Sequence, residues 1–275
     1  KNILTTDGLV LPHGVPPFDK ILPEHFMPAF ERGMSLHEAE IDAITSNKDE
    51  ATFENTILAY DNAGQMLAQT ELVFGMLCAA ETNDRMQALQ EQAMPLLAAH
   101  RDKIRLDDKL FVRVKEVYDR RAALGLDAEQ MRLLQKTYDS FVRAGALLDA
   151  EQKARLKEIN GQLSLTAVKF GNNILAENNN FVLELKSDEL DGLPAGIRDA
   201  AREKAQQMGK GDKWVFTLHK PSLIPLLTYS TRRDLREKIY KAYLNRCNNG
   251  DEYDNKQLIN DFIRLRTEKA HLLGL

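Results

Sequence analysis

Histidine is the residue type in this chain best suited to metal binding or proton transfer, yet the spacing of its histidines does not assemble a site. A zinc site on one helix needs two histidines four residues apart, with a glutamate directly after the first. His37 and Glu38 begin this pattern, but Ile41 stands where the second histidine is required. The other histidines are isolated: His13, His25, His100, His219 and His271. Lone histidines in helical stretches, such as His37, His100 and His271, are therefore expected to be packed or exposed side chains and not metal ligands.

The remaining reactive groups are equally dispersed. Cys78 and Cys247 lie in different segments, so no disulfide is expected, and Cys78 is predicted to be a small buried hydrophobe. Gly209-Lys210-Gly211 lacks the spacing of a phosphate-binding loop and is typical of a helix C-terminus. The acidic pairs Asp107-Asp108 and Asp188-Glu189 stand where helices begin, and capping accounts for them. The sequence by itself assigns no catalytic, cofactor-binding or metal-binding residue.

The composition is that of an ordinary globular protein. The chain has 275 residues, enough for one large domain or two. Its net charge is −4 and its basic residues are scattered, which gives no footprint for nucleic acid. No run approaches the ~18 apolar residues that a membrane span needs. We therefore expect neither a nucleic acid nor a membrane as a partner.

The longest periodic stretch runs from Asp149 to Glu177 and predicts one long helix. Apolar residues recur there at steps of three or four and share one face: Leu156, Ile159, Leu163, Ala167, Phe170 and Ile174. Asp149 and Gln152 have the spacing of a capping box at its start. At a rise of ~1.5 Å per residue this helix would be roughly 43 Å long, sufficient to form the axis of a helical domain.

Shorter amphipathic stretches precede the long helix and predict helices joined by short links. Their approximate limits are 23–46, 52–80, 84–100, 107–124 and 127–145. Helices with such short links usually pack as antiparallel neighbours. Residues 1–22 are predicted to be extended, because Pro12, Pro16 and Pro17 oppose a helix there.

The pattern changes after Ala176. Residues 178–180 are three asparagines and predict a turn, and the runs 181–185 and 214–218 favour β-structure. A short helix is predicted between those two runs, at about 195–208, and helical periodicity resumes near Pro221.

The sequence therefore predicts a mainly α fold, a multi-helix bundle with a small β-hairpin-like insert at about 181–218. Its expected domains are an extended N-terminal arm at 1–22, an N-terminal helical domain at 23–177, and a region of insert and helices at 178–275.

Several short blocks, taken in order along the chain, resemble one known family. The opening block is Pro16-Pro17-Phe18-Asp19 with Ile21, Glu24-His25-Phe26 and Pro28-Ala29-Phe30. The later blocks are Thr52-Phe53-Glu54-Asn55-Thr56; Glu81-Thr82-Asn83-Asp84; Tyr138, Phe141, Gly145 and Leu148, with Phe170 and Asn173; and Leu265-Arg266, Glu268, Ala270 and Leu272-Leu273-Gly274. In their order and spacing they are similar to the thimet oligopeptidase-like zinc metallopeptidases, which include neurolysin, and most of all to the bacterial peptidyl-dipeptidases of that family.

The resemblance implies one half of a neurolysin-like channel fold, in which mostly helical domains flank a deep channel that admits short peptides. It also implies a zinc ion held by two histidines of an H-E-x-x-H motif and a downstream glutamate, with the motif glutamate as general base. In the family these residues follow the last matching block, and none has a counterpart in this sequence. The chain is therefore expected to be the N-terminal, non-catalytic region of a zinc peptidyl-dipeptidase, inactive alone, with zinc bound by the absent C-terminal half.

The partners implied by the resemblance are short peptides with a free C-terminus and the enzyme's own catalytic domain. A free-standing helical module that binds peptides or acts as a scaffold is the alternative. A fragment should expose more apolar surface than the few hundred Å² usual for a monomer, whereas a complete module should not. The compartment is left open between cytoplasm and periplasm, because a chain beginning at Lys1 has a trimmed N-terminus and a signal peptide could have been removed.

Overall fold

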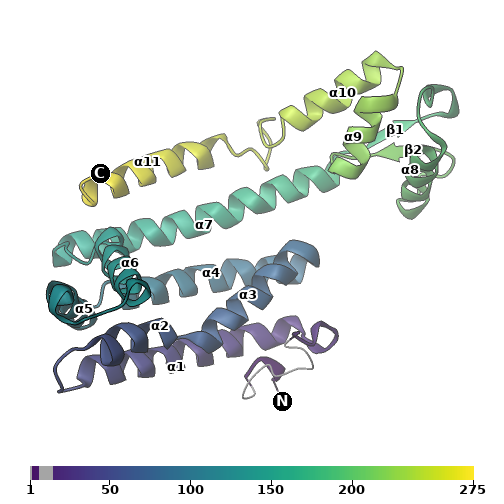
Figure 1. Cartoon of the computed structure of the whole chain (residues 1–275). Helices are drawn as coiled ribbons and strands as arrows, with labels where there is room; N and C mark the ends of the chain where they lie inside the picture. Colours follow the sequence, from purple (N-terminus) through teal and green to yellow (C-terminus); the bar gives the residue numbers. More distant parts are fainter. Residues whose placement is uncertain (1, 6–14) are drawn as a thin grey trace. The chain divides into compact units, whose positions relative to one another are not determined.

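In the computed structural model, which describes residues 2–5 and 15–275, helices make up nearly all of the regular structure, and one pair of short strands accompanies them (Figure 1). This arrangement confirms the predicted fold class, a mainly α bundle with a small β insert. The chain packs into two units, residues 1–168 together with 264–275, and residues 169–263. The domain limits expected from the sequence differ from this division and remain a prediction.

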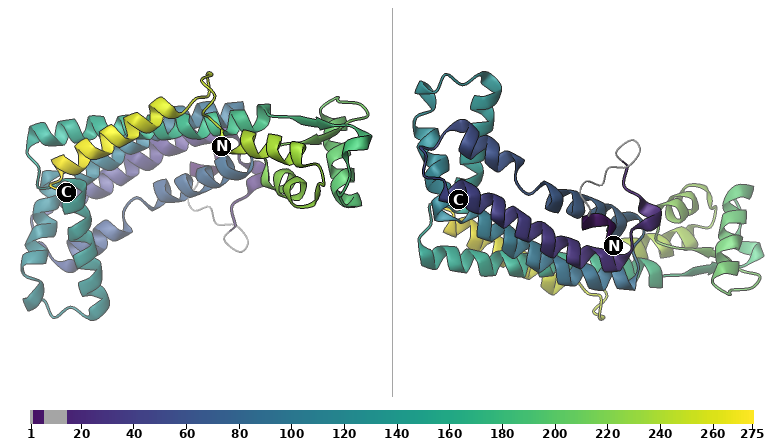
Figure 2. Two further views of the ribbon diagram at one scale, coloured as in Figure 1. Left: turned by 90° about the horizontal axis from the view of Figure 1, so that it is seen from above. Right: turned by 90° about the horizontal axis from the view of Figure 1, so that it is seen from below.

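The first unit is a set of packed helices. It contains α1 (Phe26–Ser46), α2 (Ala59–Asn62), α3 (Gln65–Ala80), α4 (Asp84–Arg105), α5 (Asp108–Asp119), α6 (Ala128–Ala144), the first part of α7 (Ala150–Asn180) and the end of α11 (Lys256–Leu272). Helix α1 packs against α3 and α4, and α5 packs against α6 (Figure 2). The end of α11 is joined to the start of α7, where Arg155 Nε donates to Glu268 Oε1 at 2.6 Å.

Side-chain caps begin several of these helices at the positions expected from the sequence. Thr52 and Asn55 form a capping box, in which the Asn55 N–H donates to Thr52 Oγ1 at 3.1 Å and the Thr52 N–H donates to Asn55 Oδ1 at 2.8 Å. Asn83, Asp107 and Asp127 each accept the backbone N–H of the third residue after them. These bonds satisfy donors that have no partner inside a helix.

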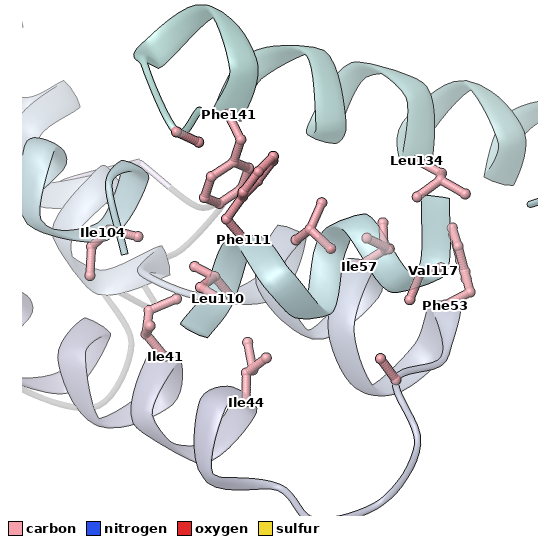
Figure 3. Close-up of a cluster of buried hydrophobic side chains, with 13 residues drawn as sticks. Ile41, Ile44, Phe53, Ile57, Ile104, Leu110, Phe111, Val117, Leu134 and Phe141 are labelled. Carbon is pink, nitrogen blue, oxygen red and sulfur yellow. The ribbon is translucent and has the colours of Figure 1, made fainter. Parts of the chain in front are cut away.

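Two apolar clusters form the core of the first unit. One cluster, which we call the α5–α6 core, is drawn in Figure 3 and contains Ile41, Ile44, Ala51, Phe53, Ile57, Ile104, Leu110, Phe111, Val114, Val117, Leu134, Phe141 and Ala146. The other joins α1, α3 and α4 through Leu4, Ile21, Phe26, Ala29, Phe30, Leu67, Val73, Phe74, Met86, Ala93 and Leu97. Burial of these side chains removes apolar surface from water, and this hydrophobic effect stabilises the packing of the helices.

The helix expected over 52–80 is interrupted. It begins as a π-helical turn, Phe53–Leu58, continues as α2, and stops at Gly64, which has a φ of +74°. A Cβ at Gly64 would lie 2.9 Å from His37 Nδ1, and the Gly64 N–H donates to Glu40 Oε2 at 2.7 Å. The break therefore depends on contacts with α1, which the local sequence pattern did not reveal.

The second unit contains the β insert. Strands β1 (Leu183–Leu185) and β2 (Trp214–Phe216) pair antiparallel, with Leu183 opposite Phe216 and Leu185 opposite Trp214. Helix α8 (Ala195–Gln207) lies between them in sequence and packs on β2. Helices α9 (Lys220–Tyr229) and α10 (Arg233–Leu244) follow. The unit's core consists of Leu183, Leu185, Leu190, Leu193, Ala201, Phe216, Leu218, Leu223, Leu226, Leu235 and Ile239.

One local prediction was wrong, and another concerns residues that the structure describes only in part. The turn expected at 178–180 is the last turn of α7, and Asn178 accepts a hydrogen bond from Arg246 Nη1 at 3.1 Å. This contact offsets the weak helix propensity of asparagine. The extended arm expected at 1–22 falls partly outside the described residues, and its described part contains 3-10 turns at Ile3–Thr5 and Phe18–Lys20.

Within the described ranges, none of the helices combines the length and the apolar character that crossing a bilayer demands.

Candidate functional site

The structure brings together two histidines that lie far apart in the sequence, His37 on α1 and His100 on α4. His100 Nε2 and His37 Nδ1 are 3.0 Å apart, so one ring nitrogen donates a hydrogen bond and the other accepts it. The other nitrogen of His100, Nδ1, lies 3.5 Å from Glu38 Oε1, and Lys103 Nζ lies 2.8 Å from Glu38 Oε2. His100 itself is buried.

Electrostatics favour the neutral form of both rings. Burial lowers the pKa of His37, and the nearby His100 lowers it further. Burial also lowers the pKa of His100, although Glu38 acts in the opposite direction. Among the described residues no group of three or more histidine, cysteine, aspartate or glutamate side chains is placed to hold a metal ion. The two rings join α1 and α4 through this contact, and their pairing has no signal in the local sequence.

This pair predicts a pH dependence of stability. Because the pKa of each ring is lowered from 6.5 in the folded chain, the unfolded chain binds more protons below that pH. The free energy of unfolding should then be at its full value above about pH 6.5 and should decrease as the pH falls below it. Urea unfolding of the chain at several values between pH 7.5 and 5.5 measures this decrease.

A double variant isolates the contribution of the pair. H37Q/H100Q removes both titrating rings, so its stability should decrease less steeply than that of the parent chain over the same pH range. H271Q, at an exposed position of α11, is the matched control and should keep the parent's slope. An equal slope in the double variant and the parent would show that the pair does not cause the effect.

The other histidines and the two cysteines named in the sequence analysis lie elsewhere in the chain. His25 Nδ1 accepts the Leu22 N–H at 3.2 Å, His219 is the N-cap of α9, and His13 lies outside the described residues. Cys78 and Cys247 are free thiols, with Cys78 half-buried beside the core that joins α1, α3 and α4.

Neither thiol is activated for nucleophilic chemistry. Burial raises the pKa of Cys78, and burial together with Glu177 raises the pKa of Cys247 to about 11. A thiol with a raised pKa contains little of the thiolate that attacks substrates or binds metals.

The acidic pairs and the glycine-rich segment lie at the ends of helical segments. Asp107 caps α5, and Glu189 Oε2 accepts the Lys186 N–H at 2.8 Å at the start of a short 3-10 turn. Gly209 and Gly211 have φ values of +66° and +62° just after α8 ends, as a helix C-terminus requires. The interpretation of these segments as helix boundaries is confirmed.

Several residues of the sequence blocks that resemble the peptidase family make hydrogen bonds that stabilise the fold. Asn55 Oδ1 accepts a bond from the buried Arg113 at 3.1 Å, which ties the π-helical turn to α5. In the second unit, Asn173 Nδ2 donates to Asn255 Oδ1 at 2.8 Å, and Asn255 Nδ2 donates to the Phe170 carbonyl at 3.2 Å. The resemblance is thus carried by caps, buried rings and helix-to-helix hydrogen bonds.

Comparison with known proteins gives long matches. No family model matches the chain. It is 36% identical over 265 residues to dipeptidyl carboxypeptidase of Escherichia coli K12, a match that covers 96% of this chain and 39% of the relative. Dipeptidyl carboxypeptidase of Salmonella typhimurium is 34% identical over 269 residues, 98% of this chain and 40% of the relative. Oligopeptidase A of Escherichia coli K12 is 26% identical over 274 residues, again 98% of this chain and 40% of the relative.

The chain spans about two-fifths of the length of these curated relatives. Its own residues are matched almost throughout, and the matches agree with the family indicated by the sequence blocks. The chain belongs to the thimet oligopeptidase-like peptidase family, together with dipeptidyl carboxypeptidase and oligopeptidase A.

Proposed function

We propose that this chain is the non-catalytic region of a zinc-dependent peptidyl-dipeptidase, an enzyme that hydrolyses short peptides and releases dipeptides from their free C-termini. In this proposal the chain forms a wall of the substrate channel and packs against the enzyme's own catalytic domain. The observation that carries it is the match along 96% of this chain to only 39% of a dipeptidyl carboxypeptidase.

The distribution of chemical groups supports a positioning role. The sequence contains no H-E-x-x-H motif. In the described part of the chain, no cluster of potential metal ligands takes its place. The residues present here do not fit a zinc site, and we propose that residues of the longer protein bind the metal. A channel wall would contribute by restricting entry and by holding the peptide backbone in place.

Exposed apolar side chains on α3 support the proposal that this helix packs against another part of a longer protein. Val73 and Phe74 of this helix are buried in the first unit, whereas Leu72 is 69% exposed and Met76 is 54% exposed. A helix that is apolar on both sides is suited to burial on both sides. In the second unit, Tyr240 and Leu244 on α10 are similarly exposed. These faces are consistent with contacts made by a longer protein.

The proposal predicts that the 275-residue chain alone does not hydrolyse peptides. A synthetic peptide with a free C-terminus would be incubated with this chain and with the longer protein, each with and without added zinc. Mass spectrometry of the products should detect C-terminal dipeptides only with the longer protein, because the chain lacks the zinc-binding motif.

The same peptide with an amidated C-terminus is the control for recognition of the free carboxylate, and it should be a poor substrate of the longer protein. Zinc-dependent release of dipeptides by the chain alone would overturn the non-catalytic assignment. If the longer protein also failed to cleave, a peptide-binding or scaffold role for these helices would replace the proposal.

A further inference from the structure

A cavity of about 470 Å³ opens in the first unit, and neither His37 nor His100 lines it. Helices α4, α6, α7 and α11 contribute its lining: Asp102, Arg105, Arg132, Lys136, Asp139, Ser140, Arg143, Ala144, Asn160 and Lys269. The residues that meet there come from distant parts of the sequence. A cavity of this volume lies within the range of small-molecule sites, about 300–1,000 Å³.

The lining is strongly basic although the chain as a whole is acidic. Five cationic side chains face two carboxylates in the cavity, whereas the net charge of the chain is −4. Three of the cations, Arg132, Lys136 and Arg143, are spaced four and seven residues apart on α6 and share one face. Within residues 2–5 and 15–275, no ion pair joins any of these three to a carboxylate. Like charges at this spacing repel one another, so an anion bound among them would be stabilised.

The two carboxylates of the cavity already have partners. Asn160 Nδ2 donates to both oxygens of Asp102, at 2.9 and 3.0 Å, and burial raises the pKa of this carboxyl. Asp139 Oδ1 accepts a hydrogen bond from Gln135 Nε2 at 2.8 Å. Neither of these contacts involves Arg132, Lys136 or Arg143.

Asn160 also fixes the position of the lysine contributed by α11. Its Oδ1 atom accepts a bond from Lys269 Nζ at 2.6 Å, so Asp102, Asn160 and Lys269 form a chain of hydrogen bonds along the cavity wall. Burial lowers the pKa of Lys269, Asp102 opposes this shift, and Arg266 and Arg105 act in the same direction as burial. A bound anion would favour the charged form of this lysine.

We propose that this cavity binds a small molecule that carries two or more phosphate groups. Arginine guanidinium groups bind phosphate oxygens through paired N–H donors, and the cavity offers three arginines, two lysines and the Ser140 hydroxyl. The lining residues come from four helices and bound a volume of about 470 Å³, a size that favours a small anion over an acidic peptide. This inference does not depend on the proposed peptidase function.

Isothermal titration of the 275-residue chain with inorganic tripolyphosphate tests the proposal. We expect one binding site per chain. Added salt should lower the affinity, because the contact is between charges. Sodium sulfate at the same ionic strength should bind much more weakly, because it offers a single anionic group. A separate titration with ATP distinguishes a nucleotide from an inorganic polyphosphate, and tighter binding of ATP would indicate an added contact to the nucleoside.

A matched pair of variants locates the site. R132Q/R143Q removes two exposed charges from the cavity and should bind tripolyphosphate about tenfold more weakly or worse, since each charged hydrogen bond is a strong one. R32Q/R198Q removes two exposed arginines elsewhere and should bind like the parent chain. K136Q is a second, single test of the cavity, and circular dichroism checks that each variant is folded.

Three results would overturn the proposal. One is tripolyphosphate binding no tighter than sulfate. Another is equal weakening in the cavity variants and in R32Q/R198Q, which would show a diffuse charge effect. The third is tighter binding of a hexaglutamate peptide than of tripolyphosphate and ATP, which would assign the surface to acidic peptides.

Discussion

Replacing Phe141 with alanine is expected to lower the free energy of unfolding by about 3–5 kcal/mol, the range for removal of a buried aromatic ring. Phe141 is fully buried in the α5–α6 core (Figure 3). Its ring centroid lies 5.3 Å from that of Tyr60 and 6.0 Å from that of Phe111. Because these rings belong to three different helices, truncation would leave a void that no single helix can fill by moving alone.

Urea unfolding followed by far-ultraviolet circular dichroism measures this loss, since the first unit is helical throughout its core. L147A is the matched control, because Leu147 lies six residues away and is 62% exposed. Its unfolding free energy should change by no more than about 0.5 kcal/mol. Equal losses in F141A and L147A would contradict the assignment of Phe141 to the core.

The sequence predicted features that depend on neighbouring residues. The Thr52–Asn55 capping box and the caps at Asp107 and Asp127 could be anticipated, because a cap requires only a polar side chain and a donor three residues later. The long helix α7 could be anticipated for a similar reason, since its apolar stripe repeats over many turns.

Features that depend on distant contacts could not be predicted in this way. The break at Gly64 is set by His37 and Glu40 on another helix. The helical state of Asn178 is supported by Arg246, 68 residues later. The same limit applies to the candidate sites, because the partner of His100 lies 63 residues away and no short motif encodes that spacing.

The basic cavity is a further case. On α6 alone, cations at helical spacing are typical of a solvated helix face, so the sequence of this helix does not indicate a binding site. Only the fold brings Arg105 and Lys269 into one cavity with that face. The family, by contrast, could be predicted from the sequence. Its blocks consist of caps and core residues that occur in the same order along the chain.

In the second unit, replacing Gly192 with alanine is expected to cost about 3 kcal/mol of unfolding free energy. Gly192 has a φ of +82°, a region that side-chain-bearing residues rarely adopt. A Cβ there would lie 2.2 Å from the Tyr229 carbonyl oxygen and 2.9 Å from the Thr231 backbone nitrogen. Both neighbours are backbone atoms, so relief of the clash requires the two segments to separate.

That separation would break the contacts on either side of the glycine. The Thr231 N–H donates to the Asp191 carbonyl at 3.1 Å, and the Thr231 hydroxyl donates to Asp191 Oδ2 at 2.6 Å. The turn also places Leu190 and Leu193 in the core of the second unit. The expected loss therefore combines backbone strain with reduced burial of two leucines.

Trp214 is the single tryptophan of the chain and lies on β2, so its fluorescence during urea unfolding reports on the second unit. G196A is the matched control, because Gly196 lies in α8 and a Cβ there would meet nothing within 4 Å. Alanine is the better helix former, so G196A should leave stability unchanged or raise it by up to about 1 kcal/mol. If G192A unfolds at the same urea concentration as G196A, then the turn is wide enough to accept a side chain and the close approach at Tyr229 does not constrain the fold.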